Sequence, residues 1–86
     1  MLKVLIADDE DNGRDATAEI LKLSKLSIEI VASTDSAAAT IKGIKTTNPD
    51  VVLLDIEMGD GTAFDVLKEF PSPQFKVIFV TAYKQY

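Results

Sequence analysis

Three short, continuous apolar runs constrain the fold of this chain more than any other feature of its sequence. They occupy residues 4–7, 51–54 and 77–80, and most of their side chains are β-branched or aromatic. Runs of this kind are too short for helices and are typical of strands covered on both faces. A fourth segment, residues 28–32, alternates at its start and predicts a half-exposed edge strand.

Helical periodicity fills the intervals between the predicted strands. The spacing i, i+4, i+7 occurs in two of them and predicts one buried stripe on each helix: Ala16, Ile20 and Leu23 on the first, Ala37, Ile41 and Ile44 on the second. Asp35 is the expected N-cap of the second helix, and Asn48-Pro49 is expected to end it.

A third helix is predicted from a capping-box pattern, in which Thr62 is followed three residues later by Asp65. Its expected inner face consists of Phe64, Leu67 and Phe70. Strands and helices therefore alternate along the chain, which indicates parallel strands joined by right-handed crossovers. We expect an α/β fold with one open parallel sheet and helices on both faces. No repeat or linker divides the 86 residues, so residues 1–86 are expected to form one unit.

The composition excludes several classes of function. The chain has no Cys and no His, so thiolate chemistry, imidazole catalysis and Cys- or His-ligated metals are excluded. Its net charge of −5 disfavours direct binding of nucleic acid by this segment. No apolar run approaches the ~20 residues that a membrane span requires. We expect a soluble, cytoplasmic protein without membrane contact.

Polar residues follow each of the three buried strands at the end where the strand stops. Asp8 and Asp9 follow the first, Asp55 ends the second, and Thr81 follows the third. The carboxyl ends of parallel strands meet at one edge of a sheet, where ligands bind. Three carboxylates held together repel one another unless a cation neutralises them, and an all-oxygen cluster suits Mg²⁺. The sequence therefore predicts a Mg²⁺ site at this edge.

Each of these residues also has a purely structural explanation. The acidic stretch at residues 8–11 can serve as a solvated helix N-terminus that complements the helix dipole. Asp55 can cap a loop, and Thr81 suits a strand without any further role. The occurrence of all the candidates at equivalent strand ends favours a common site.

Three ordered motifs, in residues 5–10, 52–61 and 77–83, resemble the successive signatures of the receiver domain of bacterial two-component response regulators. The resemblance covers essentially the whole chain and is closest to receivers that precede LytTR-type DNA-binding output domains. It implies a flavodoxin-like fold, a histidine kinase as partner and an output domain in the full-length protein. It also implies a phosphoacceptor signalling domain that is not a turnover enzyme.

The resemblance implies a role for each candidate residue. Asp55 would accept a phosphoryl group from the phosphohistidine of the kinase. Asp9 would bind Mg²⁺ directly and Asp8 largely through water, with Asp55 and the main-chain carbonyl of Glu57 completing the protein ligands. The hydroxyl of Thr81 would contact the phosphoryl group.

The sequence departs from the family pattern in three respects. Gly59 stands where Pro is usual, and Ala63 stands where a second Gly is common. A complete receiver continues through a fourth helix, a fifth strand carrying a Lys, and a fifth helix, none of which fits before Tyr86. We therefore expect an incomplete domain whose apolar fourth strand is an unpaired edge and promotes self-association.

Two other functions remain open. A pseudo-receiver would act only as a protein-interaction module and would not be phosphorylated. A haloacid-dehalogenase-type phosphohydrolase would require an Asp two residues after its nucleophile, and Glu57 occupies that position. The sequence disfavours this second alternative.

Overall fold

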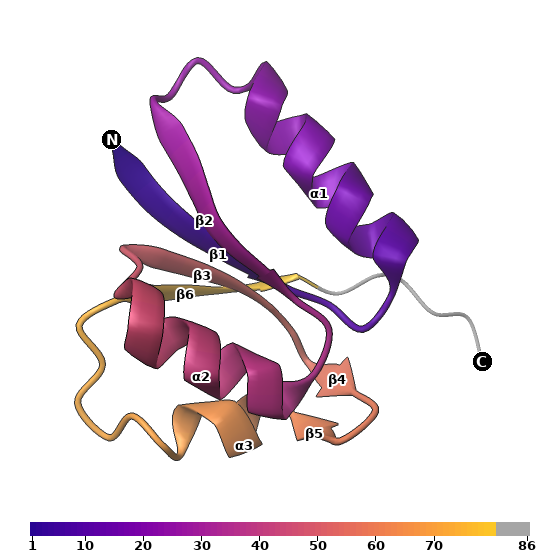
Figure 1. Cartoon of the computed structure of the whole chain (residues 1–86), viewed down its shortest axis with the longest axis vertical. Coiled ribbons are helices and arrows are strands. Elements are labelled where there is room, and N and C mark those ends of the chain that lie inside the picture. The colour runs from indigo at the N-terminus through magenta and orange to yellow at the C-terminus, as the bar shows by residue number, and fades with distance from the viewer. Residues whose placement is uncertain (81–86) are drawn as a thin grey trace.

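Four parallel strands form the central sheet of residues 1–80 (Figure 1). The computed structural model describes residues 1–80. Its elements follow the order β1 (Leu2–Ala7), α1 (Asp11–Leu23), β2 (Ile28–Thr34), α2 (Ala37–Thr47), β3 (Val51–Asp55), β4 (Glu57–Met58), β5 (Gly61–Thr62), α3 (Ala63–Leu67) and β6 (Lys76–Val80). The predicted alternation of strands and helices is confirmed.

The strand order in the sheet is β2-β1-β3-β6. The chain moves from β1 to one side to form β2 and to the other side to form β3, so the direction of winding reverses between β1 and β3. In open α/β sheets the carboxyl edge at such a reversal is where ligands bind. The predicted open, flavodoxin-like parallel sheet is confirmed, and so is the edge position of β2.

Two apolar cores lie on opposite faces of the sheet. Figure 1 shows α1 on one side and α2 with α3 on the other. Leu5, Val52 and Leu54 point to the α2 and α3 side, whereas Val4 and Ile6 point to the α1 side. These five side chains are at most 2% exposed, which is expected where successive residues of a strand face opposite layers.

The predicted inner face of α1 is wrong. Ile20 and Leu23 are 68% and 84% exposed, and Ala16 is exposed as well. Ala18 and Leu21 pack against the core instead. Two apolar stripes lie side by side on this helix, and the periodicity alone does not distinguish between them.

The predicted inner face of α2 is confirmed, but its predicted N-cap is not. Ala37 and Ile44 are buried and Ile41 packs against the same core. The N-cap is Ser36, whose hydroxyl accepts a hydrogen bond from the backbone N–H of Ala39 at 3.1 Å, so Asp35 does not have this role. The helix ends at Asn48, as predicted; this residue adopts the left-handed conformation with φ of 49°.

The capping box of α3 is confirmed, but the predicted position of Phe64 on its inner face is wrong. The Thr62 hydroxyl accepts from the Asp65 backbone N–H, and the Asp65 carboxylate accepts from the Thr62 backbone N–H. This start directs Ala63 and Val66 into the core, both 0% exposed, and leaves Phe64 60% exposed. The helix is a short one, ending at Leu67.

The strand β6 lies at the second edge of the described sheet. Ile78 and Phe79 are 53% and 45% exposed, and the ring of Phe79 lies 5.9 Å from that of Phe64. The predicted self-association through this strand stays a prediction. Within residues 1–80, none of the helices has both the length and the apolar character required to cross a membrane.

Candidate metal centre

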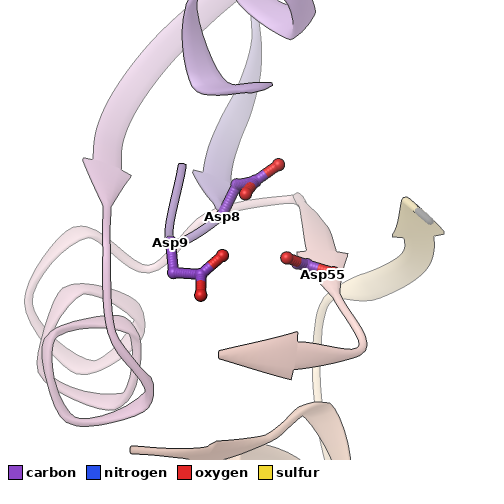
Figure 2. A group of neighbouring side chains, drawn as sticks. All are labelled: Asp8, Asp9 and Asp55. Carbon is purple, nitrogen blue, oxygen red and sulfur yellow. The ribbon is translucent and has the colours of Figure 1, made fainter. Parts of the chain in front are cut away.

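Two strands bring the predicted acidic residues together at the switch point of the sheet. Asp8 directly follows β1 and Asp55 ends β3. The two strands are adjacent and parallel, with Ala7 paired to Leu54, so their carboxyl ends stop at the same level. Figure 2 shows Asp8, Asp9 and Asp55 grouped at this edge, with Asp9 and Asp55 turned toward one another.

The three carboxylates form one compact cluster. One oxygen from each of Asp8, Asp9 and Asp55 lies within 4.8 Å of the other two. Asp8 and Asp55 are buried, at 8% and 7% exposed, whereas Asp9 is exposed. The cluster is therefore anchored in the sheet and open to solvent on the side of Asp9.

This donor set is suitable for a hard divalent cation. Mg²⁺ prefers oxygen ligands at about 2.0–2.1 Å in octahedral geometry, so the oxygens bound to one ion are about 3 Å apart at neighbouring vertices and about 4.2 Å apart at opposite ones. One oxygen from each of the three carboxylates already lies within 4.8 Å of the other two, close to these spacings. The open side leaves room for the waters that Mg²⁺ retains. The residues present could therefore hold such a metal.

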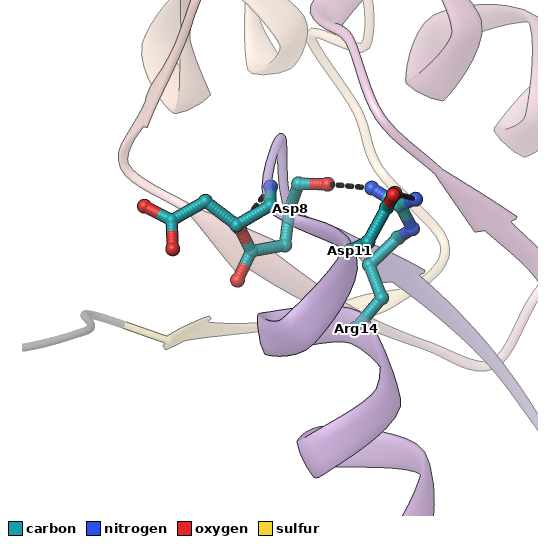
Figure 3. A network of polar contacts seen from close by, with 4 residues as sticks. Asp8, Asp11 and Arg14 are labelled. Atoms are coloured by element: carbon teal, nitrogen blue, oxygen red, sulfur yellow. Dashed lines mark hydrogen bonds and ion pairs between the residues drawn. The ribbon is translucent and has the colours of Figure 1, made fainter.

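The first turn of α1 holds Asp8 in place from two directions. The backbone N–H of Glu10 donates to Asp8 Oδ1 at 2.9 Å, and Arg14 Nη1 donates to the main-chain oxygen of Asp8 at 2.7 Å. Arg14 also forms an ion pair with Asp11, as Figure 3 shows. The guanidinium thus links the end of β1 to the start of α1.

Gly13 lies against the Asp8 carboxylate, a contact that the sequence reasoning missed. A Cβ atom at Gly13 would lie 2.3 Å from Asp8 Oδ2, much closer than van der Waals contact. The close approach explains why Gly occupies this position of a helix, where it is otherwise unfavourable. A Gly in the first turn was the available signal.

Asp60 is a second residue near the site whose contact the sequence does not predict. Its carboxylate accepts hydrogen bonds from the backbone N–H groups of Ala37 at 2.6 Å and Ala38 at 3.0 Å, at the start of α2. These backbone donors, first Ala37 and then Ala38, hold the pKa of Asp60 below its ordinary value. No local pattern signals this contact, because its partners are 22 and 23 residues away from Asp60.

The remaining predicted site residues are only partly described. Glu57 is exposed and begins β4, two residues after Asp55. Its main-chain carbonyl therefore belongs to the segment that leaves the cluster. Thr81 lies outside the described residues, so its predicted contact with a phosphoryl group stays a prediction.

Comparisons with known proteins agree with this geometry. The family model of the response regulator receiver domain matches residues 4–86. The sensory transduction protein LytT of Bacillus cereus is 36% identical over 89 residues, an alignment that covers 100% of this chain and 35% of that protein. The chain thus spans about a third of the length of this relative.

Solved structures have the same fold. A LuxR-family DNA-binding response regulator from Staphylococcus aureus superposes with a TM-score of 0.85 at 38% identity, covering 99% of this chain and 72% of that one. The MaeR response regulator bound to beryllium trifluoride gives 0.82 at 25% identity, covering 99% and 70%. The fold, the acidic cluster and the family match together lead to one conclusion: the chain belongs to the response regulator receiver domain family of two-component signalling systems.

Proposed function

We propose that this domain accepts a phosphoryl group on Asp55 from a histidine kinase, with Mg²⁺ bound at the acidic cluster, and thereby switches an output domain. One observation carries the proposal. The buried carboxylates of Asp8 and Asp55 and the exposed carboxylate of Asp9 converge within 4.8 Å at the switch point of the sheet. Carboxylates this close repel one another, and a bound cation would offset that repulsion.

Each residue has a distinct role in the proposed site. Asp9, on the solvent side, would bind the metal directly, and Asp8, held by Glu10, would bind its waters. The Glu57 main-chain carbonyl and Asp55 would complete the protein ligands. The bound Mg²⁺ would offset negative charge on the phosphoryl oxygens.

The chemical step is a transfer between two nucleophiles. A carboxylate oxygen of Asp55 attacks phosphorus, the P–N bond of the phosphohistidine breaks, and the imidazole leaves with the bonding electron pair. Asp55 lies at the end of β3 and is 7% exposed, so its backbone is fixed while one side of the cluster stays open to the donor. The thiol- and imidazole-free composition is compatible with this chemistry, since the step needs only carboxylates and a cation.

The output of the switch would lie in the longer protein. The relatives that this chain matches are about three times its length, and their names describe sensory transduction and transcriptional regulation. An output domain of the LytTR DNA-binding type is the expected partner, and this segment itself would not bind nucleic acid.

Beryllofluoride binding tests the proposal. The MaeR receiver has been solved with beryllium trifluoride, a mimic of the phosphoryl group, and a receiver with an intact site is expected to bind it in the presence of Mg²⁺. We expect amide resonances around residues 8–10 and 55–62 to shift on titration of the wild type and not of Asp55→Asn. Equal shifts in both proteins would exclude Asp55 as the acceptor. No binding by the wild type would favour the pseudo-receiver alternative, and turnover of an aryl phosphate would favour a phosphohydrolase.

A further inference from the structure

The segment that follows Asp55 is a small hairpin whose tip is attached to a distant helix. The strands β4 and β5 pair antiparallel, with Glu57 opposite Thr62 and Met58 opposite Gly61. The turn between them therefore consists of residues 59 and 60. The backbone N–H of Ala63 closes the base of the hairpin by donating to the Ile56 carbonyl at 2.8 Å.

Asp60 is the residue that attaches this tip. Both of its carboxylate oxygens accept hydrogen bonds from α2, one from the Ala37 N–H at 2.6 Å and the other from the Ala38 N–H at 3.0 Å. The adjacent Gly61 also lies close to α2, since a Cβ atom there would be 3.3 Å from the Cβ of Ala37. A charge-assisted pair of hydrogen bonds of this kind is stronger and more directional than neutral ones.

The start of α2 has a cap of its own. The Ser36 hydroxyl accepts from the Ala39 N–H and so satisfies a different donor from those that Asp60 binds. Asp60 and Ser36 therefore both stabilise the same helix end, but only Asp60 joins it to the hairpin. Ser36 therefore only caps α2, whereas Asp60 can also position the hairpin.

We infer that Asp60 is a positioning residue for the metal site: by binding the start of α2, it fixes the hairpin and hence the main-chain carbonyl of Glu57 beside Asp55. The inference rests on the proposed function, in which that carbonyl is a metal ligand. The hairpin has only two residues in each strand, too few to be rigid without outside contacts. Burial of Met58 in the core holds its β4 strand, and the Asp60 hydrogen bonds hold its turn. Groups that orient metal ligands typically change metal affinity about 10–100-fold when removed.

The experiment compares Asp60→Ala with Ser36→Ala. Both variants remove an acceptor from the N-terminus of α2, so both are expected to lower stability in urea. Only Asp60→Ala is expected to accelerate hydrogen exchange of the amides of residues 57–62 in the metal-free protein and to weaken Mg²⁺ binding about tenfold, measured by NMR titration. Asp60→Asn keeps one acceptor oxygen for α2, and we expect it to restore part of the affinity. If Asp60→Ala does not fold, the same measurements are made on Asp60→Asn.

Two results would overturn the inference. One is wild-type Mg²⁺ affinity and wild-type hairpin exchange in Asp60→Ala. The other is an equal loss of affinity in Ser36→Ala, which would reduce Asp60 to a helix cap. If the proposed function is wrong, the wild type itself will not bind Mg²⁺ at the cluster. In that case, faster hydrogen exchange confined to the hairpin in Asp60→Ala would still support the attachment of the hairpin to α2.

Discussion

Replacing Asp55 with Asn should stabilise the metal-free domain while abolishing its response to Mg²⁺. One carboxylate oxygen of Asp8 lies within 4.8 Å of one of Asp55, and both residues are buried. Two unit charges at that separation repel by about 1 kcal/mol in water and about 3.5 kcal/mol at an effective dielectric constant of ~20. Asn has nearly the shape of Asp and removes the charge, so the relief of this repulsion alone favours the variant by about 1–3.5 kcal/mol without added metal.

Urea unfolding in EDTA and in Mg²⁺ measures both effects. In EDTA, each kcal/mol of added stability should raise the urea midpoint by about 0.3–1 M, because the free energy of unfolding falls by about 1–3 kcal/mol per M of urea. In Mg²⁺ at about 100 times its Kd, the wild type should gain about 2.7 kcal/mol, and Asp55→Asn should gain much less. Adding the metal should therefore reduce or reverse the difference in stability between the wild type and Asp55→Asn.

Asp15→Asn is the matched control, because Asp15 is exposed on α1 and the variant makes the same change in net charge. It should leave both measurements near those of the wild type. An Asp55→Asn protein that is less stable than the wild type in EDTA would refute the argument from charge repulsion. Equal stabilisation of the wild type and Asp55→Asn by Mg²⁺ would mean that the metal binds away from Asp55.

Four further outcomes follow from the structure. Leu54→Ala empties a site that is 0% exposed and should cost about 2–5 kcal/mol in urea unfolding; a loss below about 1 kcal/mol would contradict the packing. The capping-box backbone N–H lowers the pKa of Asp65 below 3.8, so its carboxylate stabilises the fold fully above that pH and loses this effect as the pH falls through the lower folded value. The stability difference between wild type and Asp65→Asn should shrink accordingly, and a constant difference down to pH 2 would refute it. Gly13→Ala should displace the Asp8 carboxylate and shift the amide resonances of the turn that follows Asp8. Gly59→Ala should not, because there is open space around Gly59. Equal NMR spectra of the two variants would argue against the contact between Gly13 and Asp8. Light scattering after size-exclusion chromatography should detect self-association through β6, and a monomer at high concentration would count against it.

The arrangement of the sheet was predictable because it depends on local patterns. Apolar runs of strand length, helical spacing between them and the capping box at Thr62 all act over a few residues, and each predicted element was found. The proximity of Asp8 and Asp55 was also accessible, since parallel strands necessarily bring their carboxyl ends to one edge. The sequence alone therefore predicts where the acidic cluster lies.

The orientation of the helices was not predictable from the same patterns. On α1 the Ile20 and Leu23 stripe satisfies the periodicity, yet Leu21 is the residue that packs on the sheet. On α3 the large Phe64 is exposed while the smaller Ala63 and Val66 are buried. A hydrophobic period identifies a helix, but which stripe faces the core depends on the shape of the layer beneath it.

The sequence by itself determined the order of the elements, the parallel sheet and the edge at which the carboxylates gather, because each depends on neighbouring residues or on strand direction. Only the tertiary structure decided that Gly13 makes room for Asp8 and that Asp60 joins the hairpin to α2. The Asp60 contact joins residues more than 20 positions apart. The Gly13 contact depends on how α1 is turned against the end of β1. Both form only when the layers pack. The Gly in the first turn of α1 is a local signal for the first contact but does not identify its partner, and no local pattern indicates the second.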